Sequence, residues 1–221
     1  MSGVFVTSSG TGVGKTYVTA ALIRAARAAG APARAIKPVI SGWEDDPAAI
    51  ADSDTGQLLA AQGIDATAEA IAACSPFRFK EPLSPDMAAA REGREIDFDA
   101  LVAFCRDAVE KSTPGETVFI EGVGGVMVPL TDRHTVLDWI AALDLPVLLV
   151  VGSYLGTISH TLTAVQTLRT KHIAVRAVVI SESEDNPVPP EETAETIQRH
   201  MGAGAVEIVG RGGAIRNLFG Q

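Results

Sequence analysis

The chain has 221 residues, of which 47% are hydrophobic and 20% charged, so it can bury an apolar core and is not a disordered chain. Its formal net charge of −9 argues against a generally basic surface that binds nucleic acid, although a local anion pocket stays possible. The longest apolar runs are far shorter than the ~20 residues of a membrane helix, and two cysteines are too few for a disulfide framework or a four-ligand zinc site. We therefore expect a cytoplasmic protein without a nucleic-acid or membrane partner.

Short β-rich runs alternate with longer helical patterns, which is typical of βαβ units and a parallel sheet. Several of the runs are almost continuously apolar, as expected for strands that are covered on both faces. In chain order, the sequence predicts a strand at 4–7, a helix at 16–29, a strand at 34–39, a helix start at 84–86, a helix at 97–111, strands at 117–121 and 146–151, a helix at 159–171, a strand at 176–181, a helix at 191–201 and a strand at 205–209.

The segment 41–95 is irregular and polar enough to be an insertion over one edge of the sheet. The chain shows no internal repeat, no low-complexity tract and no flexible linker. The sequence therefore predicts one α/β domain over residues 1–221, with a mostly parallel sheet between two layers of helices.

A glycine-rich loop between the first strand and the first helix is the strongest local motif, with the sequence SSGTGVGKT over residues 8–16. Glycines allow backbone N–H groups to approach a phosphate closely, and the following helix adds the positive end of its dipole. Lys15 can reach the terminal phosphates of ATP, and the Thr16 hydroxyl can ligate Mg²⁺. A P-loop usually has glycine six residues before its lysine, where this chain has Ser9. The strand and helix on either side still predict a P-loop NTPase-like fold, with a ligand-free glycine turn as the alternative.

Polar residues also lie at the ends of other predicted strands, where ligands bind in an open parallel sheet. Lys37 could stabilise charge on a transferring phosphoryl group, although a lysine at a strand end can also simply extend into solvent. Glu121 could be a Mg²⁺ ligand or a solvated carboxylate, since Mg²⁺ is held by one or two carboxylates plus phosphate oxygens. Asp54 is a second candidate ligand, but Ser53 and Asp54 are equally typical of a helix cap.

Taken together, these residues resemble the dethiobiotin synthetase family, and the resemblance covers nearly the whole chain in order. It implies a homodimeric, Mg²⁺-dependent ligase that acts on 7,8-diaminononanoate and CO₂ or bicarbonate. One amine forms a carbamate, ATP phosphorylates it, and the second amine closes the ureido ring with release of phosphate. The resemblance rests on FVT at 5–7, the P-loop, KPVISG at 37–42, SD at 53–54, SP at 84–85, EGVGG at 121–125, VPL at 128–130 and LGTISHTL at 155–162.

The same resemblance implies roles for individual residues. Lys37 steadies the carbamate and the transferring phosphoryl group, and Lys15 spans the β- and γ-phosphates. Thr11 and Ser41 position the diamine and the carbamate. The turn Gly156-Thr157, at the start of a helix, receives the carboxylate of the substrate. The implied metal ligands are Thr16, Asp54 and Glu121, and the implied ATP-binding residues are Gly12, Val13, Gly14, Lys15, Thr16, Tyr17, Asp54, Glu121, Gly122, Val123, Gly124 and Ser181.

Three features depart from the pattern of that family. Gly10 and Gly12 stand where the family often has acidic residues, so any substrate contact made by those carboxylates is missing. Ser181 stands where an asparagine typically reads the adenine, and a hydroxyl cannot offer the paired donor and acceptor of an amide. The tail 206–213 lacks the usual proline-containing turn near the base. We therefore expect weak discrimination among nucleotide bases.

Two other functions stay open at this point. A switch ATPase of the ParA/MinD type has the same sheet and loop, but it carries an extra lysine early in the loop, where this chain has Ser8, Ser9 and Gly10. A divergent paralogue would keep the fold and act on another amine, which the departures at Gly10, Gly12 and Ser181 would allow.

Overall fold

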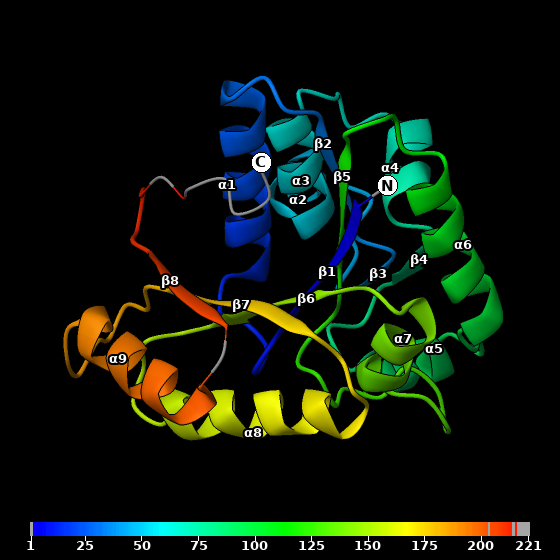
Figure 1. Cartoon of the computed structure of the whole chain (residues 1–221). Coiled ribbons are helices and arrows are strands. Elements are labelled where there is room, and N and C mark those ends of the chain that lie inside the picture. Colours follow the sequence, from blue (N-terminus) through cyan, green and yellow to red (C-terminus); the bar gives the residue numbers. More distant parts are fainter. Residues whose placement is uncertain (1, 203, 214, 216–221) are drawn as a thin grey trace.

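The computed structural model describes residues 2–202, 204–213 and 215, so the expected domain 1–221 includes a few positions outside the described residues (Figure 1). The strands of the main sheet all pair in parallel, which confirms the predicted sheet. Their bounds are β1 (Ser2–Ser8), β2 (Ala33–Ile36), β5 (Thr117–Glu121), β6 (Val147–Val151), β7 (Val175–Ser181) and β8 (Ala205–Val209). Their order is β2-β5-β1-β6-β7-β8, and Phe5 in β1 is in register with Ile120 in β5 and Val147 in β6.

Helices pack on both faces of this sheet, giving three layers (Figure 1). Helices α1 and α3 cover one face, and α6, α7, α8 and α9 cover the other. Within the described residues the helices are α1 (Lys15–Ala28), α2 (Pro47–Asp52), α3 (Asp54–Gln62), α4 (Ala68–Cys74), α5 (Pro85–Arg91), α6 (Phe98–Glu110), α7 (Val136–Leu143), α8 (Thr157–Thr170) and α9 (Pro190–Met201). The predicted helices at 16–29, 97–111, 159–171 and 191–201 are thus confirmed within two residues at each end.

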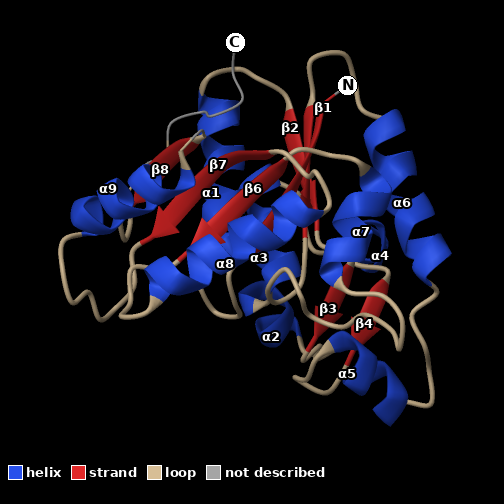
Figure 2. Cartoon of the chain, turned by 60° about the horizontal axis from the view of Figure 1, so that its bottom comes forward, coloured by secondary structure: helices blue, strands red, loops and turns tan. Residues whose placement is uncertain are grey.

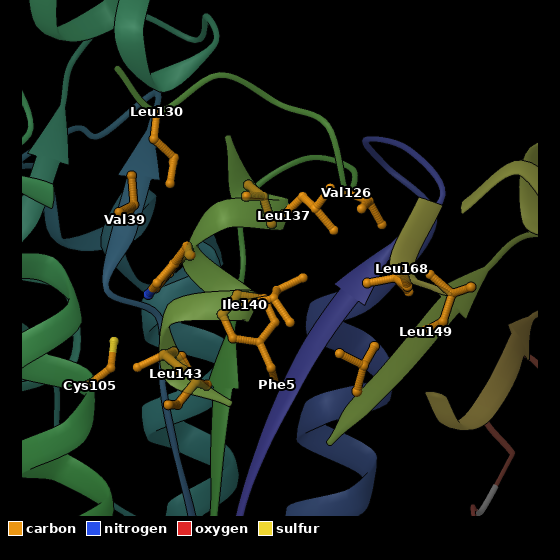
Figure 3. Packing of buried hydrophobic residues seen from close by; sticks show 14 of the residues in the cluster. Phe5, Val39, Cys105, Val126, Leu130, Leu137, Ile140, Leu143, Leu149 and Leu168 are labelled. Atoms are coloured by element: carbon orange, nitrogen blue, oxygen red, sulfur yellow. The ribbon is translucent and has the colours of Figure 1, made fainter. Parts of the chain in front are cut away.

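Alternate residues of β1 face opposite layers, as a strand buried on both faces requires. Val4 and Val6 belong to the core on the α1 side, and Phe5 belongs to the core on the α7 side. The ring of Phe5 meets Trp139 of α7 edge to face, with 4.8 Å between ring centroids. Figure 3 shows the core on the α7 side from close by, with Ile140 of α7 next to Phe5. The central strand that carries the P-loop is therefore fixed from both sides.

The predicted strand 34–39 is wrong as a single element, because the chain leaves the main sheet after β2. Pro38 has no N–H to donate to a ladder, so a strand does not continue through it. Beyond it, β3 (Val39–Ser41) pairs with β4 (Phe77–Phe79) in a separate parallel pair, seen apart from the main sheet in Figure 2. This break places Lys37 in the turn between the two sheets.

The segment 41–95 is more regular than the sequence suggests, since it contains β4 and four helices, α2 to α5. Its helix α3 packs against α1 and β2, beside the main sheet. Helix α7 was missed by the sequence analysis, although Thr135 and Asp138 form a capping box at its start. In the part of the chain that the structure describes, no helix is both long and apolar enough to cross a membrane.

Candidate active site

The loop between β1 and α1 has the backbone shape of a phosphate cradle. Gly12 and Gly14 have φ values of 73° and 90°, a region that residues with a Cβ rarely adopt. Gly14 is the N-cap of α1, and no side chain caps this helix, so its first N–H groups are available to an anion. A Cβ on Gly14 would collide with the Ser181 hydroxyl, so the loop lies directly against the end of β7. A residue with a Cβ is therefore strained here by conformation and would also force the Ser181 side chain to move.

Lys15 is buried at the floor of this loop, where the sequence analysis missed its partner, Ser8. The Lys15 ammonium donates to the Ser8 hydroxyl oxygen at 3.1 Å. The same hydroxyl lies 2.6 Å from the carbonyl of Gly10 and 2.8 Å from that of Gly124. Ser8 thus joins the P-loop to the glycine-rich turn after β5. Its only sequence signal is its position as the last residue of the strand before the loop.

Lys37 lies at the centre of a buried polar cluster and is only 2% exposed. Its ammonium is 3.0 Å from a carboxylate oxygen of Asp54, 3.0 Å from one of Glu121 and 2.7 Å from the carbonyl of Gly122. The Thr16 hydroxyl lies 2.7 Å from Asp54 and 2.8 Å from Glu121. The structure thereby brings together four predicted site residues from α1, α3, β5 and the turn after β2.

Helix α3 begins in a way that leaves the Asp54 carboxylate available to this cluster. The Ser53 hydroxyl accepts from the N–H of Gly56 and caps the helix, so the cap and the candidate ligand are neighbouring residues. On the other side, the N–H of Lys37 donates to the carbonyl of Cys74 at 3.1 Å, which fixes the backbone at the turn. Ser53 is therefore the helix cap, and Asp54 as a metal ligand stays a prediction.

The two lysines differ in their electrostatic surroundings. Burial alone lowers the pKa of Lys37, but the Glu121 and Asp54 carboxylates outweigh it and raise this pKa above the usual lysine value. Burial also opposes ionisation of Asp54, yet Lys37 and the Thr16 hydroxyl hold the Asp54 pKa below its usual value. The pKa of Lys15 is lowered to about 8, first by burial and then by the charge of Lys37. A bound triphosphate would favour the charged form of Lys15.

Thr16, Asp54 and Glu121 fit a magnesium ion by their chemistry. Hydroxyl and carboxylate oxygens are the hard donors that Mg²⁺ prefers. Glu121 is fully buried, and its second carboxylate oxygen has no hydrogen-bond partner among the described residues. In the same part of the chain no group of three or more His, Cys, Asp or Glu side chains could hold a metal alone. An ion here would therefore need oxygens of phosphate or water as further ligands.

A cavity of about 800 Å³ opens beside this cluster. Ser41 lines it, and its buried hydroxyl has no hydrogen-bond partner in the described structure, so this hydroxyl is available to a ligand. Thr11, Val123 and Gly124 also line it. The apolar part of its lining comes from Pro82, Leu83 and Pro85 of segment 41–95 and from Ile40 and Val128 outside that segment.

A second cavity, of about 570 Å³, lies between the P-loop and the ends of β7 and β8. Ser181 and Val13, two of the predicted ATP-binding residues, line it. Glu182 and Arg211, which the sequence analysis missed, line it too. Gly12, Gly14 and Tyr17 line both cavities, so the two are neighbouring parts of one edge of the sheet.

Some of the predicted site residues line neither cavity. Neither Gly156 nor Thr157 lines either cavity. The Thr157 hydroxyl donates to the carbonyl of Gly152 at 2.7 Å and is therefore committed to the turn before α8. The carbonyl of Gly122 accepts a hydrogen bond from the Lys37 ammonium, and Gly122 does not line the cavity.

Comparisons with known proteins agree with this arrangement. A protein-family model described as an AAA domain matches residues 2–213. The ATP-dependent dethiobiotin synthetase BioD of Methylobacterium nodulans is 56% identical over 215 residues, which cover 96% of this chain and 95% of that protein. BioD of Acidiphilium cryptum is 56% identical over 205 residues, with coverages of 92% and 90%. Among solved structures, the MinC:MinD cell division protein complex of Aquifex aeolicus has a TM-score of 0.56 at 14% identity and covers 95% of this chain and 81% of that chain. This last likeness concerns the fold alone and confirms the P-loop NTPase-like architecture.

Proposed function

Because this chain belongs to the dethiobiotin synthetase family, we propose that the larger cavity beside its P-loop is the place where the ureido ring is closed. The protein is an ATP-dependent ligase of biotin biosynthesis, an activity that implies diaminononanoate and CO₂ as substrates. The convergence of Lys37, Asp54, Thr16 and Glu121 next to the P-loop carries the assignment of the site.

In this proposal the triphosphate of ATP lies along the P-loop. The N–H groups at the start of α1 face its oxygens. The Lys15 ammonium gives up its hydrogen bond to the Ser8 hydroxyl and contacts the β- and γ-phosphates instead. The base and sugar occupy the second cavity, between Val13 and Ser181. Thr16, Asp54 and Glu121 would hold Mg²⁺, which supplies positive charge that neutralises the phosphate oxygens.

Lys37 and Ser41 act on the substrate side of the cavity. One amine of the substrate attacks CO₂, so that an N–C bond forms and the amine loses a proton. The Ser41 hydroxyl and Thr11 hold the resulting carbamate in line with the γ-phosphorus, where proximity supplies much of the rate. Lys37 stabilises the charge that develops on the phosphoryl group as it moves from ADP to the carbamate oxygen. The second amine then attacks the carbonyl carbon and loses a proton, the C–O bond to phosphate breaks, and phosphate leaves with the electron pair of that bond.

The apolar wall suits the hydrocarbon chain of the substrate. Pro82, Leu83 and Val128 offer no charge to a methylene chain, while the polar wall faces the two amines. For the carboxylate of the substrate, the family resemblance points to backbone N–H groups at the start of α8, where the helix dipole favours an anion, although Gly156 and Thr157 lie outside both cavities of this chain. The Thr157 hydroxyl takes no part, because it is bonded to Gly152.

We take residues 1–221 as one P-loop domain in which 41–95 is an insertion that borders the active site. A homodimer is expected from the family resemblance, and light scattering of the purified protein measures it directly.

The decisive experiment measures phosphate release from MgATP with and without 7,8-diaminononanoate plus bicarbonate, and identifies the product by mass. We expect release that depends on the diamine and a product with the mass of dethiobiotin. Hydrolysis indifferent to the diamine would contradict the assignment and favour a switch ATPase. Release that depends on a different amine would favour the paralogue.

A further inference from the structure

We propose that Tyr17 is a positioning residue for the nucleotide base: its hydroxyl holds the loop 210–213 in place as the outer wall of the second cavity. This inference rests on the proposed function, because it takes that cavity as the place of the base. Tyr17 itself lies on the first turn of α1, two residues after the P-loop lysine.

A hydrogen bond across the fold ties this helix to the loop. The Tyr17 hydroxyl donates to the carbonyl of Gly210 at 2.9 Å, although the two residues are 193 positions apart. The same carbonyl accepts from the N–H of Gly213 at 2.9 Å and so closes the turn of the loop. Tyr17 therefore donates to the same carbonyl oxygen that closes the turn of the loop.

A second anchor acts on the next residue. A carboxylate oxygen of Glu182 accepts from the N–H of Arg211 at 3.1 Å. The N–H of Glu182 in turn donates to the carbonyl of Val209 at 3.0 Å, so this residue continues the pairing of β7 with β8 beyond the strands. Gly210 is thus held by Tyr17 of α1, and Arg211 is held by Glu182, which follows β7.

Val209 before the loop and Ile215 after it are buried in the core on the α1 side, but within the loop itself few other contacts are seen among the described residues. Strand β8 is at the edge of the main sheet and has β7 as its neighbour. The ion pair of Arg211 with Glu184 joins side chains that are 57% and 82% exposed, and an ion pair of that kind contributes little to stability. The partly buried bond from Tyr17 is therefore the contact best placed to hold the loop against the P-loop side.

Because of its position, Tyr17 should affect binding of the base and not binding of the phosphates. Tyr17 lines both cavities, but its hydroxyl is bonded to the wall of the base cavity. Losing that hydroxyl frees the wall and leaves the glycines, Lys15 and Thr16 of the P-loop unchanged. A ligand with a base should then bind more weakly, and a ligand made of phosphates alone should not.

The test compares MgATP with magnesium inorganic triphosphate on the Tyr17→Phe variant by isothermal titration calorimetry. We expect the affinity for MgATP to fall about 3- to 10-fold, the net worth of one hydrogen bond, and the affinity for triphosphate to stay the same. In steady state the KM for ATP should rise while kcat at saturating ATP is unchanged. The chain has two tyrosines, so Tyr154→Phe is the matched control; its hydroxyl contacts His160, and ATP affinity should not change.

Equal weakening of ATP and triphosphate would overturn the inference and assign Tyr17 to the phosphate site. Unchanged ATP affinity would overturn it as well. A second variant, Glu182→Ala, removes the other anchor and should show the same selective loss, so the test does not depend on one substitution. The binding measurements contain no diamine, so they are independent of whether wild-type protein makes dethiobiotin.

Discussion

Replacing Lys37 by alanine removes the positive charge that holds the buried cluster together. The variant leaves the Asp54 and Glu121 carboxylates facing each other without the ammonium that now lies 3.0 Å from each. In the proposed reaction it also removes the charge that stabilises the transferring phosphoryl group. We expect kcat to fall on the order of 10²-fold or more, the usual loss when a preorganised stabiliser of charge is removed. Nucleotide affinity should change little, since Lys15 and the P-loop stay in place.

The same substitution should lower the stability of the metal-free protein. Removing one partner of a buried ion pair costs about 3–5 kcal/mol, because the remaining charge is left without compensation. Magnesium should return part of this loss, since the ion would bring positive charge to Asp54 and Glu121. Denaturant unfolding with and without Mg²⁺ therefore separates the two effects, and Mg²⁺ should stabilise Lys37→Ala more than wild type.

Lys111→Ala is the matched control for this experiment. Lys111 pairs with Asp107 on the surface of α6, with side chains 73% and 55% exposed, so its loss should change neither kcat nor stability by much. A folded Lys37→Ala protein whose kcat stays within about tenfold of wild type would refute the role assigned to this lysine.

Three further predictions test the rest of the site. Glu121→Gln should raise the Mg²⁺ concentration for half-maximal activity about tenfold or more, since a contact to a charged group is worth about 1.5–3 kcal/mol, and an unchanged Mg²⁺ titration would make Glu121 structural. With Ser181 beside the base cavity, initial rates should favour ATP over CTP or GTP by less than about a hundredfold, and a larger preference would contradict this expectation. Burial raises the pKa of Cys105 to about 12 and also raises that of Cys74, so both thiols stay protonated at pH 8. A disulfide reagent should therefore modify both cysteines only after unfolding. Rapid labelling of the native protein would contradict this prediction, because it would show that the thiols are accessible.

The sequence predicted those parts of the fold and site that local pattern determines. The apolar strands and the glycine loop follow from composition and spacing, and Lys37 and Glu121 follow from their places near strand ends. The contact of Lys37 with Asp54 could not be predicted in the same way. It depends on the break at Pro38, which turns Lys37 out of the sheet, and on the packing of α3 against α1.

The missed features have a common physical cause, which is that their partners are distant in sequence. Ser8 reaches Gly124 across 116 positions, and Tyr17 reaches Gly210 across 193. A serine or tyrosine beside a P-loop carries no local pattern that names such a partner. Helix α7 is different, because the Thr135 and Asp138 capping box was visible in the sequence and could have been used to find it.

The charge of the site differs from the charge of the chain, and this difference decides what the protein can bind. The whole chain carries a formal −9, which would repel a nucleotide at long range. Within the cluster, Lys15 and Lys37 balance Asp54 and Glu121 in formal charge, and the N–H groups of α1 add partial positive charge. A magnesium ion at the two carboxylates would turn this balance positive at the point where the γ-phosphate is expected. The acidic composition therefore argues against a polyanion spread over the surface, while the buried cluster can still accommodate one triphosphate.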